Sequence, residues 1–313
     1  MTYKIAFLFP GQGSQVIGMG REIVDFYPET REIFDAVDTI CRRPISKLCF
    51  EGPMDELTLT VNLQPAITAA NLVCLAALNS ANVRPTVSAG HSLGEYAALA
   101  ASGIISSDDA LRLAKERGAL MLRESMVNPG AMAAVVGLDI EAVGKIVDEA
   151  GQKGILAVAS HNTAEQVVIT GEKEPLSSAM ALVKEKGAKA IPLKVSGAWH
   201  CDLMKNAVDD FRKTMENIPF SPPERKMLFN ATADQETDPE KIRDIMARQL
   251  TSPVKWYDIV QKMLEDEINV FVEVGPKNVL TGLLKKILPR ESEVKIFNVG
   301  DSAGLHNLLE SLS

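Results

Sequence analysis

The order of apolar patterns in the middle of the chain constrains the fold more than any other feature of the sequence. These patterns predict a strand, a helix, two strands, a helix and a strand, at residues 131–138, 140–150, 156–160, 166–170, 174–186 and 188–195. The turn-rich stretch 161–164 should join the two central strands. This β-α-β-β-α-β order is the split pattern of ferredoxin-like units, and its length of about 70 residues is enough for a small domain.

The sequence on either side of this unit alternates strands with helices. Apolar runs predict strands at residues 4–9, 86–90, 269–274 and 293–299, and helical patterns occur at 20–39, 65–81, 95–101 and 107–126. Such alternation is typical of an α/β fold with a mainly parallel sheet. We therefore predict a core domain formed by residues 1–127 and 197–313, with a small domain at 128–196 inserted into it. Because ligand sites favour domain interfaces, the functional cleft should lie between the two domains.

Composition and charge argue against several classes of protein. The 313 residues are 46% hydrophobic and 24% charged, which is ordinary for a globular enzyme. The net charge of −8 argues against a nucleic-acid-binding protein, which needs a basic face. The four cysteines form no C-x-x-C pair, so we expect no metal site and no redox dithiol, and their scarcity suits a reducing cytoplasm.

Two uncharged stretches bear on targeting and membrane insertion. The apolar run before Pro10 is too short for the core of a signal peptide. The stretch 57–83 is long enough to span a membrane, but it contains a proline and several amide side chains, which are poorly tolerated in lipid. We therefore expect a helix buried within an α/β protein and no membrane partner.

The strongest local motif is Gly90-His91-Ser92-Leu93-Gly94, which has the G-x-S-x-G pattern of a nucleophile elbow. In such an elbow the serine lies on a sharp turn between a strand and a helix, and here a predicted strand precedes the motif and a predicted helix follows it. The helix N-terminus places backbone N–H groups beside the serine. This context favours Ser92 as a nucleophile over the alternative, a serine with a purely structural place in a turn.

A serine nucleophile needs a base, and histidine is the usual one near neutral pH. We favour His200, which lies where the chain re-enters the core domain after the small domain. His91 should point away from its neighbour Ser92, His161 should lie in a loop of the small domain, and His306 should lie in a polar C-terminal helix. No acid follows in the order typical of α/β-hydrolases, so a backbone carbonyl could hold the Nδ1–H of His200 and give a serine–histidine dyad.

Arg117 interrupts an apolar face of the helix predicted to begin at residue 107. A charge turned inward must be paired, because burying it alone is very unfavourable. The sequence leaves two alternatives for Arg117, an internal ion pair with a core carboxylate or a bidentate clamp for a substrate carboxylate.

The glycine-rich stretch after the first strand begins Gly11-Gln12-Gly13. The next glycine, Gly18, comes five residues later, whereas the dinucleotide-binding pattern G-x-G-x-x-G needs three, so no dinucleotide cofactor is expected. A glycine-rich turn at the end of a strand can still present backbone N–H groups to an oxyanion.

Together these features resemble the bacterial malonyl-CoA:acyl-carrier-protein transacylases and the acyltransferase domains of polyketide synthases. The matching stretches occur in the same order along essentially the whole chain, at residues 9–15, 64–66, 89–99, 166–171, 195–200, 249–256 and 273–276. The resemblance implies a hydrolase-like core with a ferredoxin-like insert. It also implies site roles for six residues: nucleophile (Ser92), base (His200), carboxylate clamp (Arg117), oxyanion-hole N–H groups (Gln12 and Leu93), and a backbone carbonyl that orients the histidine (Gln249).

The chain departs from the family pattern at three places. Trp199 stands where phenylalanine is common before the histidine, Cys201-Asp202 replaces a serine and a proline after it, and Lys277 replaces a glycine. The first two departures are expected to border the acyl pocket, so they bear on substrate preference.

The resemblance implies an acyltransferase that moves malonyl from malonyl-CoA to the phosphopantetheine thiol of holo acyl carrier protein, through a malonyl-serine ester, in fatty-acid biosynthesis. It implies no cofactor, because the coenzyme A thioester is a substrate, and we expect a cytoplasmic monomer. Three alternatives stay open: a free-standing acyltransferase of a polyketide synthase, an acyl-thioester hydrolase on the same fold, and a non-enzymatic module that binds the carrier. An intact pair of Ser92 and His200 argues against the last.

Overall fold

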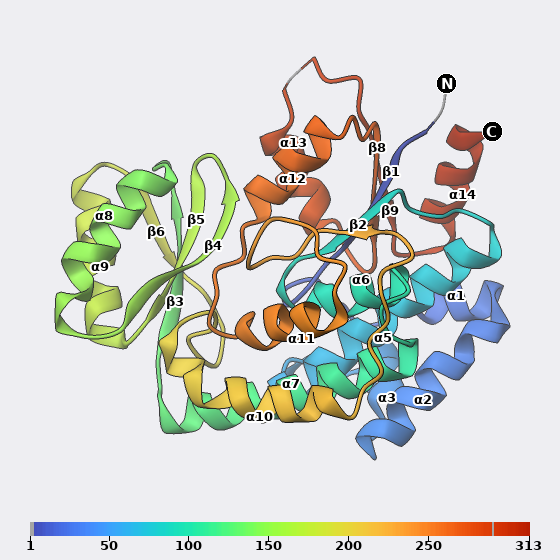
Figure 1. Ribbon diagram of the computed structural model, residues 1–313, viewed down its shortest axis with the longest axis horizontal. Coiled ribbons are helices and arrows are strands. Elements are labelled where there is room, and N and C mark those ends of the chain that lie inside the picture. Colours follow the sequence, from blue (N-terminus) through green and yellow to red (C-terminus); the bar gives the residue numbers. More distant parts are fainter. Residues whose placement is uncertain (1–2, 290) are drawn as a thin grey trace.

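A computed structural model of the protein describes residues 3–289 and 291–313 and confirms the predicted fold class (Figure 1). The described residues form a five-stranded sheet in the order β7-β2-β1-β8-β9 and a four-stranded sheet in the order β4-β5-β3-β6. The two sheets lie in separate parts of the molecule, with the four-stranded sheet at the left of Figure 1. The predicted domain boundaries at 127/128 and 196/197 stay a prediction, and residues 1, 2 and 290 of the predicted core lie outside the described chain.

The five-stranded sheet is parallel throughout, as the alternation of strands and helices predicts. Its strands are β1 (Ile5–Phe9), β2 (Val87–Gly90), β7 (Lys226–Met227), β8 (Val270–Val274) and β9 (Lys295–Val299). Every residue of β1, β2 and β8 is buried. A parallel sheet covered on both faces needs such unbroken burial, which explains why β1 is a continuous apolar run and why β2 and β8 contain only one polar residue each, Ser88 and Glu273.

Helices cover both faces of this sheet. Phe7 and Phe9 of β1 point into the core formed with α5 (Thr60–Ser80) and α7 (Ser107–Val127), whereas the alternate residues Ala6 and Leu8 point into a second core. That second core is formed with α12 (Trp256–Glu265) and α13 (Val279–Ile287). The remaining helices are α1 (Arg21–Phe26), α2 (Arg31–Cys41), α3 (Ile45–Glu51), α4 (Met54–Leu57), α6 (Glu95–Ala101), α10 (Lys205–Glu216), α11 (Pro239–Arg248) and α14 (Ser302–Leu312).

The structure tests two of the predicted helical segments, 20–39 and 57–83. The pattern at 20–39 is two helices rather than one, because Pro28 begins a short 3-10 turn, Pro28–Thr30, between α1 and α2 and cannot continue an α-helix. The buried helix predicted within 57–83 is confirmed as α5. Among the described residues α5 alone is long and apolar enough to cross a membrane, yet 89% of its most apolar window is buried inside the protein.

The four-stranded sheet is antiparallel and has the predicted β-α-β-β-α-β order. Its strands are β3 (Ala131–Val136), β4 (Leu156–Thr163), β5 (Gln166–Gly171) and β6 (Lys189–Pro192), and its helices are α8 (Ile140–Ala150) and α9 (Lys173–Glu185). Both helices lie on the side away from the five-stranded sheet (Figure 1) and form a third apolar core with the strands.

The prediction that 161–164 is a turn, with His161 in a loop, is wrong for residues 161–163, and of this stretch only Ala164 lies in the turn that joins the two strands. Strand β4 continues to Thr163 and pairs with β5 through two bulges. The His161 N–H also donates to the Val254 carbonyl at 2.9 Å, and Ser160 forms a parallel bridge with Val254. These long-range pairings, invisible in the local sequence, outweigh the turn preference of the polar residues.

Candidate active site

Ser92 lies on a strained turn between β2 and α6. Its φ of 52° is unusual for a residue other than glycine. A Cβ on Gly90 would lie 1.9 Å from the Gly94 carbonyl carbon, and a Cβ on Gly94 would lie 1.9 Å from the Phe9 carbonyl oxygen. Only glycine fits at these two positions, so the G-x-S-x-G spacing is what allows the chain to turn sharply and expose the serine at the end of β2.

His200 lies against the serine. Its Nε2 is 2.8 Å from Ser92 Oγ, and its Nδ1 is 3.0 Å from the carbonyl oxygens of both Gln249 and Ser252. Because two carbonyls face Nδ1, the proton of the neutral ring belongs there, and Nε2 is left free to accept the serine proton. The structure therefore brings together Ser92, His200 and the Gln249 carbonyl as the sequence predicts, and it adds Ser252 as a second acceptor.

The electrostatic environment keeps His200 neutral. Burial, and after it the nearby Arg117 guanidinium, lower the pKa of His200 to about 3, although the two carbonyl acceptors oppose the shift. A neutral imidazole can act as a base at any pH well above this value. His200 also has a positive φ of 63°, so both members of the pair are held in uncommon backbone conformations.

Arg117 is buried at the base of the same site, with 1% of its surface exposed. Its Nε donates to Gln249 Oε1 at 3.1 Å, its Nη1 to Gln64 Oε1 at 3.0 Å, and its Nη2 to Ser92 Oγ at 3.1 Å. All three acceptors are uncharged. Among the described residues no carboxylate forms an ion pair with Arg117, so the alternative of an internal ion pair is not what the structure contains.

The two predicted oxyanion-hole residues, Gln12 and Leu93, line the cleft beside Ser92. Strands β1 and β2 are neighbours with Phe9 opposite Gly90, so the loop after β1 lies against the elbow after β2. A Cβ on Gly11 would lie 2.5 Å from the His91 carbonyl oxygen, which shows how closely the two backbones approach. The oxyanion-hole role of their backbone N–H groups stays a prediction.

A buried polar scaffold surrounds the elbow, and sequence reasoning missed two of its members. Asn230 Oδ1 accepts from the Ser92 N–H and Asn230 Nδ2 donates to the Gly90 carbonyl, each at 2.7 Å. Gln249 Nε2 donates to the Ser92 carbonyl at 2.8 Å and to Glu95 Oε2 at 2.6 Å. Glu95 falls within the family-like stretch 89–99, which could have drawn attention to it. Asn230 carries no local signal.

The other three histidines lie away from the reacting atoms. His91 Nε2 pairs with Asn162 Oδ1 at 2.8 Å instead of facing Ser92, in agreement with the expectation. His161 packs against Tyr257 with 4.9 Å between ring centroids, and His306 pairs with Glu310 at 3.1 Å on α14. Within residues 3–289 and 291–313 there is no group of three or more His, Cys, Asp or Glu side chains placed to hold a metal ion.

The cleft around Ser92 has a volume of about 260 Å³ and is lined from both sheets. The five-stranded sheet and its connections contribute Ser92, Arg117 and His200, and the four-stranded sheet contributes mostly apolar side chains such as Met132 and Val168. Trp199 lines the cleft as expected. The expectation that Cys201 and Asp202 border it is wrong for this structure, because the Cys201 side chain turns back to the Ala198 carbonyl and Asp202 is exposed.

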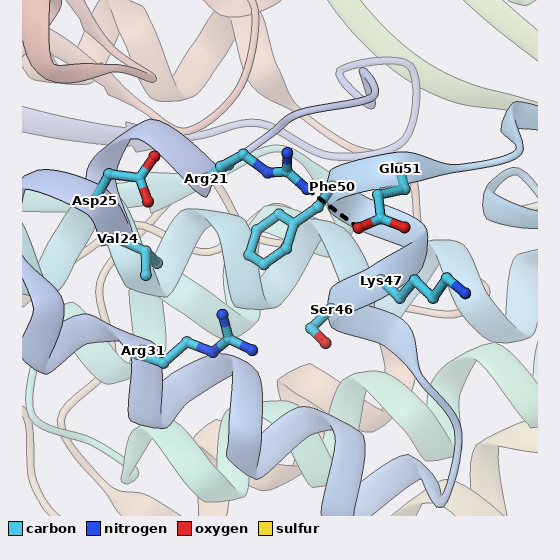
Figure 2. A pocket seen from close by; sticks show the side chains of 8 residues that line it. All are labelled: Arg21, Val24, Asp25, Arg31, Ser46, Lys47, Phe50 and Glu51. Carbon is cyan, nitrogen blue, oxygen red and sulfur yellow. Dashed lines mark hydrogen bonds and ion pairs between the residues drawn. The ribbon is translucent and has the colours of Figure 1, made fainter.

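A second hollow, about 610 Å³, lies over α1, α2 and α3 (Figure 2). Arg21 and Arg31 both lie near the Phe50 ring, with guanidinium carbons 5.1 and 5.7 Å from its centroid. Both cations are already ion-paired, Arg21 with Glu51 and Arg31 with Asp35. None of the side chains lining this hollow is a histidine or cysteine, so the serine–histidine cleft is the better candidate for chemistry.

Comparisons with known proteins agree with this geometry. Residues 6–301 match the family model described as acyl transferase domain. The chain is 38% identical over 311 residues to the malonyl CoA-acyl carrier protein transacylase of Bacillus subtilis, covering 99% of this chain and 97% of that protein. It is 38% identical over 287 residues to the enzyme of the same name from Escherichia coli K12, covering 91% and 93%.

Solved structures are similar over nearly the whole chain. An acyl carrier protein S-malonyltransferase from Vibrio cholerae superposes with a TM-score of 0.93 at 37% identity, covering 97% of this chain and 99% of that one. A malonyl-transacylase solved in complex with its type II polyketide synthase acyl-carrier protein superposes with a TM-score of 0.94 at 36% identity, covering 98% and 99%.

Proposed function

Because the chain belongs to the family of acyl transferase domains, we propose that it transfers malonyl from malonyl-CoA to the phosphopantetheine thiol of acyl carrier protein. The observation that carries this proposal is the meeting of three groups in one buried site. Ser92 lies on an elbow, and two groups lie within hydrogen-bonding distance of its Oγ: a neutral histidine, His200, and an arginine with only uncharged hydrogen-bond partners, Arg117. A nucleophile, a base and a cation in these positions are the groups needed to transfer an acyl group that carries a free carboxylate.

The first half-reaction forms an ester on Ser92. Its Oγ attacks the thioester carbon of malonyl-CoA while His200 Nε2 takes the hydroxyl proton. Negative charge then builds on the carbonyl oxygen and is held by the backbone N–H groups of Gln12 and Leu93, an arrangement worth about 3 kcal/mol per donor. When the tetrahedral intermediate collapses, the carbon–sulfur bond breaks and His200 returns the proton to the departing coenzyme A sulfur.

The second half-reaction runs the same steps with the carrier. The phosphopantetheine thiol gives its proton to His200 and its sulfur attacks the malonyl-serine carbonyl. The bond to Ser92 Oγ breaks, His200 protonates the serine, and the malonyl thioester of the carrier leaves. Because one base serves both halves, the kinetics should be ping-pong.

Arg117 is proposed to bind the free carboxylate of the malonyl group. No carboxylate contacts the buried guanidinium directly, and Glu95 acts on it only at longer range, so an incoming anion can still pair with its positive charge. A guanidinium forms two parallel hydrogen bonds to a carboxylate, which adds geometric selection to the attraction. An acetyl group offers no such partner and should be disfavoured.

Two alternatives concern the acceptor and the pathway. Water could replace the carrier thiol, which would make the protein a thioester hydrolase. The likeness to a malonyl-transacylase bound to a type II polyketide synthase carrier supports the second, a free-standing acyltransferase in polyketide synthesis. Fatty-acid synthesis is the pathway we propose, as the resemblance of the sequence implies.

The setting of the enzyme is also proposed. The net charge of −8 and the burial of α5 support an enzyme that acts in the cytoplasm without nucleic-acid or membrane partners. The monomeric state and the absence of a cofactor stay predictions from the sequence.

The deciding experiment is the intact mass of a holo carrier protein after incubation with malonyl-CoA and a catalytic amount of the enzyme, with free malonate quantified in the same sample. We expect the carrier to gain one malonyl group and little free malonate to form. Free malonate accumulating without loaded carrier would instead establish a hydrolase. An unmodified carrier with intact malonyl-CoA would refute both reactions.

A further inference from the structure

Glu95 is a buried acid that the mechanism above does not use. It is the first residue of α6, three positions after Ser92, and none of its surface is exposed. Its Oε1 accepts from the Asn230 N–H at 2.7 Å, and its Oε2 accepts from Gln249 Nε2 at 2.6 Å. A buried carboxylate is expensive unless it is hydrogen-bonded, so both oxygens have the partners that burial demands.

The partner that matters is the side-chain amide of Gln249. An amide has a donor end and an acceptor end, and here each faces a group of the opposite kind. Its Nε2 donates to Glu95 Oε2 and to the Ser92 carbonyl, while its Oε1 accepts from Arg117 Nε at 3.1 Å. If the amide turned over, its NH2 group would face the Arg117 N–H, and its oxygen would face two acceptors.

Glu95 is the stronger of the two acceptors that face Gln249 Nε2. The Ser92 carbonyl is a neutral acceptor, whereas an ionised carboxylate forms a shorter hydrogen bond of roughly twice the strength. The observed distances agree, at 2.6 Å to Glu95 and 2.8 Å to the carbonyl. At the Nε2 end of the amide, the orientation of Gln249 therefore depends mainly on Glu95, which adds to the preference that Arg117 Nε imposes at the Oε1 end.

We propose that Glu95 is a positioning residue: it fixes the Gln249 amide so that the amide oxygen holds Arg117 with its guanidinium facing Ser92. This inference rests on the proposed role of Arg117 in binding the acyl carboxylate. It assigns Glu95 no contact with the substrate. Its effect should appear in the discrimination between malonyl and acetyl groups, because that is the property that depends on where Arg117 points.

The test is the ratio of kcat/KM for malonyl-CoA to kcat/KM for acetyl-CoA, measured on the full chain at about pH 8, where a carboxyl with a pKa of about 7 is mostly ionised. Glu95→Gln places an NH2 group where an acceptor is needed. We expect the ratio to fall by about tenfold, since one hydrogen bond to a charged group is lost, with the change mainly on malonyl-CoA.

Glu273→Gln is the matched control. Glu273 is also fully buried, on β8, and accepts from the N–H groups of Leu280 and Thr281 at 2.9 and 2.7 Å. Its substitution disturbs a buried carboxylate of the same kind without touching Gln249, so thermal stability should fall while the ratio stays at the wild-type value. An equal fall in the ratio for both variants would overturn the proposal, because the effect would then be a general loss of core integrity.

A double-mutant cycle tests whether Glu95 acts through Gln249. Gln249→Ala removes the amide and keeps the backbone carbonyl that faces His200, so it should lower the ratio by itself. Adding Glu95→Gln to Gln249→Ala should then cause no further fall, whereas independent effects would multiply and refute the proposal. Should Glu95→Gln fail to fold, an unchanged ratio in Gln249→Ala would refute it equally.

The same measurements distinguish a failure of the proposed role of Arg117 from a failure of the proposed role of Glu95. A wild-type enzyme that does not prefer malonyl over acetyl would overturn the proposed role of Arg117 and this inference together. A wild-type enzyme that discriminates, with Glu95→Gln folded and discriminating equally well, would overturn only the inference about Glu95.

Discussion

The two walls of the cleft differ in the chemical character of their side chains. The wall formed by the five-stranded sheet and its connections carries the ionisable and nucleophilic groups, Ser92, His200 and Arg117. The lining residues from β3, β4 and β5 include no ionisable side chain: they are the apolar Met132, Ala134, Ala159 and Val168 and the uncharged polar Ser160, Asn162 and Gln166. The contrast suggests that chemistry is set by one wall and the space for the acyl group by the other.

Removing the nucleophile should have the largest effect, because it tests directly whether the wall with Ser92 carries the chemistry. Ser92→Ala should lower acyl transfer by about 10⁴-fold or more and abolish the covalent acyl-enzyme, because no other group can form the ester. Intact mass of the enzyme after incubation with malonyl-CoA measures the ester directly. Ser88→Ala is the control, since Ser88 is buried on β2, the strand that leads into the elbow, but lies outside the cleft lining. Transfer retained by the Ser92 variant would refute the whole scheme.

The next largest effect should come from Arg117. Arg117→Ala should lower kcat/KM for malonyl-CoA by about 10- to 100-fold, the value of a hydrogen-bonded charge contact. It should raise kcat/KM for acetyl-CoA, because the hydrogen bond from Arg117 to Ser92 Oγ is also lost. Steady-state kinetics with both thioesters measure the change. Arg112→Ala on the same helix is the control, because Arg112 is half exposed and pairs with Asp109. A gap between the two substrates as wide as in the wild type would contradict the clamp.

A third prediction concerns pH. His200 must be neutral to act as a base, so reactivity of Ser92 is present above the pKa of His200 and lost as the pH falls through it. Burial and Arg117 hold that pKa near 3, far below the ordinary 6.5. Reaction of Ser92 with an uncharged sulfonyl fluoride should therefore stay constant from about pH 8 down to about pH 5.

The same reagent applied to Arg117→Ala should show an acid limb at higher pH. Removing the guanidinium removes one of the two main influences that lower the pKa of His200, so the pKa should rise. The rate against pH, with folding checked by circular dichroism at each pH, measures the shift. A wild-type limb near pH 6.5 would contradict the picture of a base kept neutral by its surroundings.

The smallest effect should come from the apolar wall. Met132→Ala on β3 should change kcat/KM for malonyl-CoA by less than about threefold, because the residue fills space and touches no charge, yet it should raise the rate with bulkier acyl groups. Malonyl-CoA and a 2-alkyl malonyl-CoA are the pair to compare. Met132→Leu, which nearly keeps the volume, should resemble the wild type. A large fall in kcat/KM for malonyl-CoA would contradict the view that this wall only provides space for the acyl group.

Local chemistry made much of the fold predictable from the sequence. Buried strands such as β1 and β8 are short, largely apolar segments ended by proline or glycine, and the elbow at Ser92 needs two glycines because backbone atoms crowd it. The end of β4 was not predictable in this way, because its last residues have turn-forming side chains and are held in the strand by β5 and Val254.

The candidate site was predictable where a residue type is scarce or a motif is short. Ser92 stands in a recognisable motif, and His200 is one of only four histidines. The scaffold behind them was not predictable, because Asn230 and Gln64 act through hydrogen bonds between segments far apart in the chain. Nothing in the residues around Asn230 distinguishes it from any other asparagine in a loop.

The hydrogen bond from Arg117 Nη2 to Ser92 Oγ has a consequence for timing. A cationic donor occupies a lone pair of the hydroxyl and makes it a poorer nucleophile. Ser92 is therefore less reactive in the enzyme without substrate. A carboxylate that binds the guanidinium competes for that donor. We expect Ser92 to become a better nucleophile when a malonyl carboxylate binds Arg117. With thioesters that have no carboxylate, Arg117 should stay hydrogen-bonded to Ser92 and the serine should stay less reactive.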